Sequence, residues 1–345
     1  MDIIPSDNLN PGYQELLERI SHRYVEGQAQ AVRSVNETIV ETNWQIGKYI
    51  VEFEQGGQKK AKYGSKLLNN LSRDLTLRHG QGFSRSNLNY MRLFYLRFPI
   101  CETLSHKLSW SHYFELVKIS DDLELSFYYQ QNLLENWSVR ELKRQKDSGL
   151  FMRLALSKNK DEILKLAQHG QIIESPQDII KDVYVLEFLK IPEPHAISET
   201  ELETRLLDHL QTFFLELGKG FTFVGRQYRM MINNIAYRVD LVFYHRILRC
   251  FVLIDLKIAD VKHDDIGQMN MYMGYFANEE NDEDDNPPIG MILSKDKDEL
   301  LVEYATYGMN SQLFVSKYQL YLPNKEELRA LIHRHLMADE RNHSK

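Results

Sequence analysis

The sequence predicts an α+β protein, with a helical amino-terminal half followed by a mixed β-sheet core flanked by helices. From residue 11 to about residue 150, apolar side chains recur at three- and four-residue steps, which is the period of an amphipathic helix. Between residues 221 and 258, three runs have the composition of strands, and helical patterns precede and follow them. Prolines punctuate the chain from Pro176 to Pro194. We therefore expect two domains, residues 1–175 and 176–345.

Composition limits the class of protein. The 345 residues are 43% hydrophobic and 26% charged, which is typical of a globular protein with sizeable cores. No apolar stretch is long enough to span a bilayer, the first residues lack the pattern of a signal peptide, and two cysteines are too few for a disulfide framework. We expect no membrane partner and a reducing, cytoplasmic location. The net charge of −7 argues against nucleic-acid binding by the whole surface.

The first predicted element runs from Pro11 to about Glu54, as one long helix or two stacked ones, and Gly56-Gly57 end the pattern. Its apolar positions favour an amphipathic helix that faces a core. The alternative is the seam of a coiled-coil dimer, which leaves a homo-oligomer open.

A basic segment follows. Residues 59–97 contain nine lysines and arginines against one acid, Asp74. Two helices are predicted, from Lys66 to His79 and from Ser84 to Phe98, across a glycine-containing turn. This pattern is typical of a helix-turn-helix, whose second helix can enter a DNA major groove. The candidate nucleic-acid-binding side chains are Lys66, Arg85, Asn87, Asn89 and Arg92. The alternative is a scaffold pair with a solvated basic face.

The run from Phe251 to Ile258 is apolar except for one acid and one base, which is typical of a strand covered on both faces. Strand geometry places Leu253, Asp255 and Lys257 on one side of the sheet. Burying an unpaired charge is costly, so this side requires a partner or an ion.

A second strand is predicted over residues 237–245, joined to the first by a loop of about two residues. If His245 faces Leu248, Asp240 faces Leu253 and lies diagonal to Asp255 on the same side. Two carboxylates one strand apart suit a hard divalent cation such as Mg²⁺. A neighbouring lysine can orient or deprotonate water and offset negative charge.

Asp240 followed by Asp255-x-Lys257 resembles the motif of the PD-(D/E)xK nuclease superfamily. Nearly the whole chain is similar to the YhcG-like nucleases with a helical amino-terminal domain; the strings 216–221 and 223–227 carry this closer match. Val239 stands where the superfamily has a proline. The resemblance implies a restriction-endonuclease-like core: helix 199–217, strands 221–232, 235–245 and 248–258, helix 264–277 and strand 288–294.

The resemblance also implies an activity. It is that of a metal-dependent endonuclease that hydrolyses phosphodiester bonds, with DNA favoured over RNA as partner. Mg²⁺, with Mn²⁺ as the alternative, would be held by Asp240, Asp255, the Leu256 carbonyl and Glu203. Lys257 would position the nucleophile, and Gln268 would approach the site from the following helix. Glu203 is chosen over Glu199 and Glu201 because it shares the inward face of Leu206 and Leu207.

Two other interpretations stay open. The chain could be a catalytically inactive nucleic-acid-binding or assembly protein that retains the nuclease fold. Asp255 and Lys257 could also form a structural ion pair, which would leave Asp240 unexplained.

Overall fold

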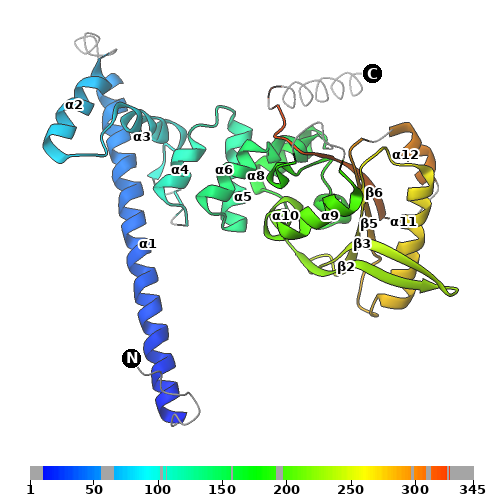
Figure 1. Cartoon of the computed structure of the whole chain (residues 1–345). Coiled ribbons are helices and arrows are strands. Elements are labelled where there is room, and N and C mark those ends of the chain that lie inside the picture. Colours follow the sequence, from blue (N-terminus) through cyan, green and yellow to red (C-terminus); the bar gives the residue numbers. More distant parts are fainter. Residues whose placement is uncertain are drawn as a thin grey trace. The chain divides into compact units, whose positions relative to one another are not determined.

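The computed structural model of the chain describes residues 11–55, 66–101, 104–105, 107–156, 158–191, 197–296, 299–307, 312–324 and 326. The chain forms two compact units: Met1–Leu125 with Asn136–Leu142, and Ser126–Glu135 with Lys143–Lys345 (Figure 1). The chain thus passes between units around residues 125–143, while the expected limit of the nuclease-like domain, between residues 175 and 176, stays a prediction. Over the described residues, no helix combines the length and apolar character needed to cross a bilayer.

The first unit is helical. It contains α1 (Pro11–Gln55), α2 (Leu67–His79), α3 (Arg85–Arg97), α4 (Trp110–Leu116), the start of α5 (Asp122–Glu135) and part of α6 (Val139–Asp147). A small core forms where α1, α2 and α3 meet, around Ile50, Leu67, Leu88 and Met91. Gly47 allows this approach, since a Cβ there would overlap the Met91 carbonyl.

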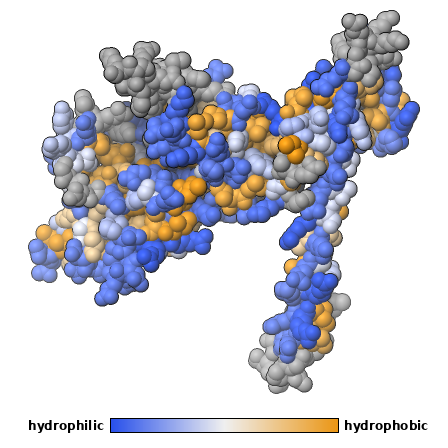
Figure 2. Space-filling model, turned by 180° about the vertical axis from the view of Figure 1, so that it is seen from behind, coloured by the Kyte–Doolittle hydropathy of each residue, from blue (hydrophilic) through white to orange (hydrophobic). Residues whose placement is uncertain are grey.

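Helix α1 is a single helix, and its first half does not face a core. Apolar side chains along it are exposed, with Ile20 at 59% and Tyr24 at 65%, and burial begins only at Val40. Figure 2 shows such side chains along this rod. The expectation of a core-facing helix was therefore wrong for this half, because a helical period predicts an apolar face and does not say what covers it.

The turn between α2 and α3 follows the sequence prediction. Gly80 and Gly82 have φ values of 83° and 116°, a region that favours glycine. Ser84 caps α3, because its hydroxyl accepts a hydrogen bond from the Asn87 backbone N–H at 3.2 Å.

The second unit contains a mixed six-stranded sheet with helices on both faces, which confirms the predicted fold class. Its strands follow the order β1-β6-β5-β4-β3-β2; β2, β3 and β4 are antiparallel neighbours, and β4, β5, β6 and β1 run parallel. The strands are β1 (Val183–Val185), β2 (Phe221–Ile232), β3 (Ile235–His245), β4 (Cys250–Lys257), β5 (Ile289–Ser294) and β6 (Gln312–Gln319). The helices are α7 (Leu150–Ala155), α8 (Lys160–His169), α9 (Glu199–Asp208), α10 (Leu210–Leu217), α11 (His263–Tyr275) and α12 (Glu299–Thr306).

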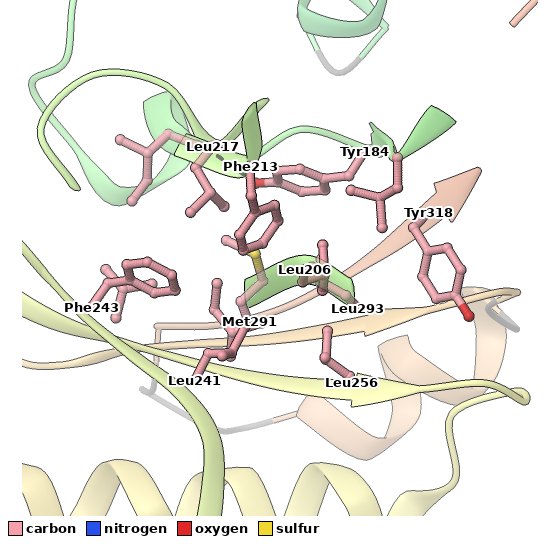
Figure 3. Close-up of a cluster of buried hydrophobic side chains, with 14 of the residues drawn as sticks. Tyr184, Leu206, Phe213, Leu217, Leu241, Phe243, Leu256, Met291, Leu293 and Tyr318 are labelled. Atoms are coloured by element: carbon pink, nitrogen blue, oxygen red, sulfur yellow. Dashed lines mark hydrogen bonds between the residues drawn. The ribbon is translucent and has the colours of Figure 1, made fainter. Parts of the chain in front are cut away.

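Two apolar layers enclose the sheet. On one face, α9 and α10 bury Leu206, Phe213 and Leu217 against strand residues such as Leu256 and Met291 (Figure 3). On the other face, α11 and α12 pack against a second cluster that includes Leu253, Ile292, Met269 and Tyr272. Strand β4, which carries Asp255 and Lys257, therefore contributes to both cores, as its apolar run predicts.

Some elements differ from the sequence prediction. The helix expected over residues 199–217 ends at His209 and restarts as α10. The short edge strand β1 and helix α8 were not predicted. Residues 325–336 have the sequence pattern of a closing helix, and all of them except Glu326 lie outside the described residues.

A buried ionic cluster joins α7, α10 and the segment leading to β1. The Glu216 carboxylate accepts from Arg153 Nη1 at 2.5 Å and from the Val185 N–H at 3.0 Å. Lys181 donates to the Glu216 carbonyl, and Arg153, Glu216 and Lys181 are almost completely buried. Burial opposes the charge of Glu216, but the surrounding cations lower its pKa below the ordinary value.

Candidate active site

The β3–β4 hairpin sets the register of the site. His245 pairs with Cys250 and Leu241 with Ile254, so four residues, 246–249, form the loop instead of the two expected. The expected pairing of Asp240 with Leu253 was therefore wrong by two residues. An even slip leaves side chains on the same face, so the predicted face of Asp240 is kept. Asp240 lies one residue before Leu241, level with Asp255, and its Oδ2 accepts from the Leu256 N–H at 2.8 Å.

Asp255 and Lys257 are joined directly. The distance from Lys257 Nζ to Asp255 Oδ2 is 2.8 Å, and a longer contact of 3.6 Å joins Nζ to Asp265 Oδ1 on α11. Asp255 is only 6% exposed. Burial, and to a smaller extent the negative charge of Asp240, raise the pKa of the Asp255 carboxyl well above its usual range. The pair required by a purely structural interpretation is thus present, and beside it lies Asp240, which that interpretation leaves unexplained.

Burial opposes the charged form of Lys257, but the hydrogen bond and charge of Asp255 outweigh it and raise the pKa of the ammonium group. Glu199 and Asp265 act in the same direction. Lys257 therefore stays protonated at neutral pH and can donate hydrogen bonds from Nζ.

Gln227 connects two of the acids. Its Nε2 donates to Glu203 Oε2 at 2.7 Å and to Asp240 Oδ1 at 2.9 Å. Glu203 is 5% exposed, and its burial, opposed by the Gln227 hydrogen bond, raises the pKa of its carboxyl. The amide thus holds carboxylates from α9 and β3 in one place.

The other acids considered on α9 point elsewhere. Glu201 binds Arg205 at 2.9 Å on the exposed side of the helix. Glu199 accepts from the Ile258 N–H at 3.4 Å, at the end of β4. Glu203 is therefore the acid of α9 that reaches Asp240 through a shared partner.

Sequence reasoning placed Gln227 on a strand without a role. Arg226 pairs with Leu241 and Tyr228 with Val239, so Gln227 lies across from Asp240. This signal becomes visible only when the strand register is known. The sequence prediction also missed Asp265 as a partner of Lys257. Acids are common in the first turn of a helix, so the position of Asp265 in α11 gave no sign of a second role.

The structure does not join Gln268 to this group. Gln268 is half-buried on α11, and among the described residues it makes no hydrogen bond to the acids. The buried Tyr272 of the same helix lies nearer: burial first, and then the charge of Asp255, raise its pKa to about 12. The role of Gln268 stays a prediction.

The donor set suits a hard divalent cation. Within the described residues, no group of three or more His, Cys, Asp or Glu has an arrangement that could enclose a metal ion. Mg²⁺ does not require such a cage, because it usually keeps several waters and binds one or two carboxylates plus substrate phosphate. Asp240 and Asp255 supply two carboxylates whose mutual repulsion a cation would relieve. Leu256, the residue after Asp255, donates its N–H to Asp240 and so lies next to both acids. These residues therefore fit Mg²⁺.

The nucleic-acid-binding candidates of the first unit have varied surroundings. Lys66 and Arg85 are exposed, and Asn89 is half-buried. Arg92 Nε binds Glu54 Oε2 of α1 at 2.6 Å, and the Asn87 side chain donates to the Gly82 carbonyl at 3.0 Å. Arg92 and Asn87 thus have structural roles in the fold of this unit.

Two family models match separate parts of the chain. Residues 177–333 match the family described as "YhcG PDDEXK nuclease domain", and residues 19–153 match "DUF1016 N-terminal domain". The chain is 38% identical to "Putative nuclease YhcG" of Escherichia coli (strain K12) over 355 residues, covering 94% of each protein.

Two solved structures match part of the fold. One is a repair endonuclease from Pyrococcus abyssi, with a TM-score of 0.25 and 16% identity over 38% of this chain and 50% of that chain. The other is EndoMS in its apo form, with a TM-score of 0.24 and 13% identity over 38% of this chain and 49% of that chain. The present chain thus covers about half the length of these proteins. From the family match and the near-complete alignment, the chain belongs to the YhcG family of nucleases with a PDDEXK domain.

Proposed function

We propose that the protein is a metal-dependent endonuclease that hydrolyses phosphodiester bonds in DNA. The observation that carries this proposal is the convergence of Asp240, Asp255 and Lys257 from two neighbouring strands. Asp240 and Asp255, with the Leu256 carbonyl and Glu203 as further oxygen donors, would hold Mg²⁺ or Mn²⁺. When bound, the cation offsets negative charge on the scissile phosphate and acidifies water.

The protein's own groups have separate roles in this proposal. Lys257 donates hydrogen bonds from Nζ to the attacking water and to the phosphate oxygens, which stabilises developing negative charge. Asp255 and Asp265 orient its ammonium group. Gln227 and the Leu256 N–H fix both oxygens of the Asp240 carboxylate, which leaves little freedom for this side chain to rotate.

Substitution tests this assignment directly. Purified Asp255→Ala and Lys257→Ala variants are compared with wild type on linear, branched and single-stranded DNA and on RNA, with Mg²⁺ or Mn²⁺. Each change is expected to lower cleavage by roughly 10²-fold or more. Asp264→Ala is the matched control, because Asp264 is an exposed acid near the site whose partner is His263. Cleavage that survives both site changes would remove the assignment and leave a nucleic-acid-binding or assembly protein.

We also propose that α2 and α3 contact DNA as a helix-turn-helix. The support is the exposed basic surface that Lys66 and Arg85 provide and the capped start of α3. Arg85→Gln should lower DNA affinity and weaken its dependence on salt. Unchanged affinity and salt dependence would show that this helix pair is a scaffold.

The exposed half of α1 supports a homodimer. The exposed apolar residues Leu17, Ile20, Tyr24, Val35 and Ile39 are separated by 3, 4, 11 and 4 residues. Each of these steps is close to a whole number of helical turns, so the side chains lie along one side of the helix. A second copy carries the same face, so two such helices can cover each other's apolar side chains. We propose that this face pairs two copies of the chain.

A further inference from the structure

The β2–β3 hairpin extends beyond the sheet. β3 pairs with β4 from Leu241 onward, whereas its pairing with β2 continues to Ile235. Residues 226–240, which we call the arm, therefore form a two-stranded ribbon (Figure 1). A tight turn closes its tip, where Asn233 and Asn234 have φ values of 48° and 63°. The arm begins at the candidate active site, because Gln227 and Asp240 lie at its base.

The two faces of the arm differ. On one face, Tyr228, Met230 and Val239 join the apolar cluster under α11. On the other face, Arg229 and Arg238 are directly opposite each other across the two strands, and both are exposed. Like charges at opposite positions of a strand pair are destabilising, so folding alone does not account for them.

Among the described residues, no acid lies against this pair of arginines. Within the part of the chain that the structure describes, Arg229 and Arg238 make no ion pair or side-chain hydrogen bond. The protein as a whole carries a net charge of −7, so acids are abundant elsewhere. An uncompensated pair of arginines on such a protein indicates an anionic ligand.

A third arginine links the arm to the acids. Arg226 is exposed at the base of the arm. Arg226 directly precedes Gln227, whose Nε2 donates to Glu203 and Asp240, and it pairs across the strands with Leu241, the residue after Asp240. At the other end, Met231 and Ile235 are 46% and 56% exposed at the tip. The charged face thus runs from the acids toward an exposed apolar tip.

We propose that the arm binds duplex DNA, with Arg226, Arg229 and Arg238 on the phosphates beside the groove that the tip enters. Guanidinium groups bind phosphate oxygens through two parallel hydrogen bonds. The major groove of B-form DNA admits a two-stranded β-ribbon, whereas the major groove of A-form RNA is too deep and narrow. The proposal rests on the proposed function, since it names the surface that would hold the substrate beside the acids.

Binding without cleavage tests the arm. The full chain is titrated in EDTA against fluorescein-labelled duplex DNA, and against duplex RNA of the same sequence, at several salt concentrations. The Arg229→Gln/Arg238→Gln double variant should lose about tenfold or more in DNA affinity, and its slope of log affinity against log salt should fall by about 2. The control is Arg246→Gln/Arg249→Gln, which removes the same charge from the exposed loop at the opposite end of β3. It should leave both quantities near wild type.

A second variant separates binding from folding. Arg229→Glu replaces the repelling pair by an opposite-charge pair with Arg238, so its Tm should be equal to or above that of wild type while DNA affinity falls. An unchanged slope in the double variant, an equal loss in the control, or an equal loss on duplex RNA would overturn the proposal. Absence of DNA binding by wild type would overturn it as well.

The two proposals can fail separately. If the arm variants lose DNA binding in EDTA while wild type cleaves no substrate with metal, the arm is supported and the hydrolytic function fails. If wild type cleaves DNA and loses this activity on Asp255→Ala, but the arm variants bind and cleave like wild type, only the arm proposal fails.

Discussion

Glu216→Gln is the perturbation for which the structure gives the sharpest expectation. The change keeps the size and shape of the side chain but removes the charge that faces the buried Arg153 and Lys181. The Val185 N–H can still donate to the remaining oxygen, whereas the new amide group would point N–H donors at the Arg153 guanidinium. Breaking a buried ion pair on one side typically costs about 3–5 kcal/mol, because an uncompensated charge stays in the interior.

The assay follows from the position of the tryptophans. Trp44, Trp110 and Trp137 all lie in the first unit, so their emission does not report on the second. Urea unfolding followed by circular dichroism should show the second unit unfolding about 2 M earlier in the variant, for a urea dependence of about 2 kcal/mol per M. The transition seen by tryptophan emission should keep its midpoint. Glu201→Gln, at an exposed ion pair on α9, is the matched control and should cost about 1 kcal/mol or less.

The pH dependence gives a second check on the same residue. The pKa of Glu216 is lowered on folding, so its stabilising charge is fully present above the pKa of an unfolded glutamate and is lost as pH falls through the folded value. The difference between wild type and Glu216→Gln should therefore be constant near neutrality and shrink below about pH 4. A difference under 1 kcal/mol at pH 7, or one that does not change with acid, would refute this account of the cluster.

Three further predictions concern packing, metal and assembly. Gly290→Ala should destabilise the second unit by about 1–3 kcal/mol, because a Cβ there would lie 2.5 Å from Met273 Sδ of α11; Gly274→Ala, on the same helix with no atom within 4 Å, should be neutral or stabilising in thermal unfolding. Added Mg²⁺ should raise the wild-type Tm, because binding adds about 2.7 kcal/mol to the free energy of unfolding at a hundredfold excess over Kd. EDTA should reverse this rise, and an equal rise in Asp240→Asn would contradict metal binding at this residue. Ile20→Lys should convert a dimer to a monomer in light scattering, since this side chain is exposed on the single chain and would be covered in the dimer; a wild-type monomer would refute pairing through α1.

The sequence predicted that the charged residues of the candidate site lie together, because two charges in an apolar strand conflict with their surroundings. An acid and a base two residues apart in an apolar strand require an explanation, and Asp255 and Lys257 are indeed in contact. The face of Asp240 was also predicted, although the hairpin loop was two residues too short in the prediction. A strand has a side-chain period of two, so this error changed the neighbour of Asp240 and left its side of the sheet unchanged.

Other features were beyond the sequence because they depend on long-range register or on what covers a surface. Gln227 becomes a partner of Asp240 only through the pairing of β2 with β3. The helical period of α1 reveals its apolar face, but it does not reveal that burial of this face begins only at Val40. The cluster around Glu216 joins residues far apart in the chain, and none of them has a local signal.

The break between α9 and α10 at His209 has a consequence for how the site is held. One helix of this pair brings Glu203 to the acids, and the next is anchored by Glu216 in the interior. Both helices also pack into one apolar cluster, since Leu206 of α9 and Phe213 of α10 are fully buried in it. The position of the Glu203 carboxylate is therefore coupled to the buried cluster around Glu216 through the break at His209, and a substitution that disturbs this cluster is expected to change the spacing of the acids as well.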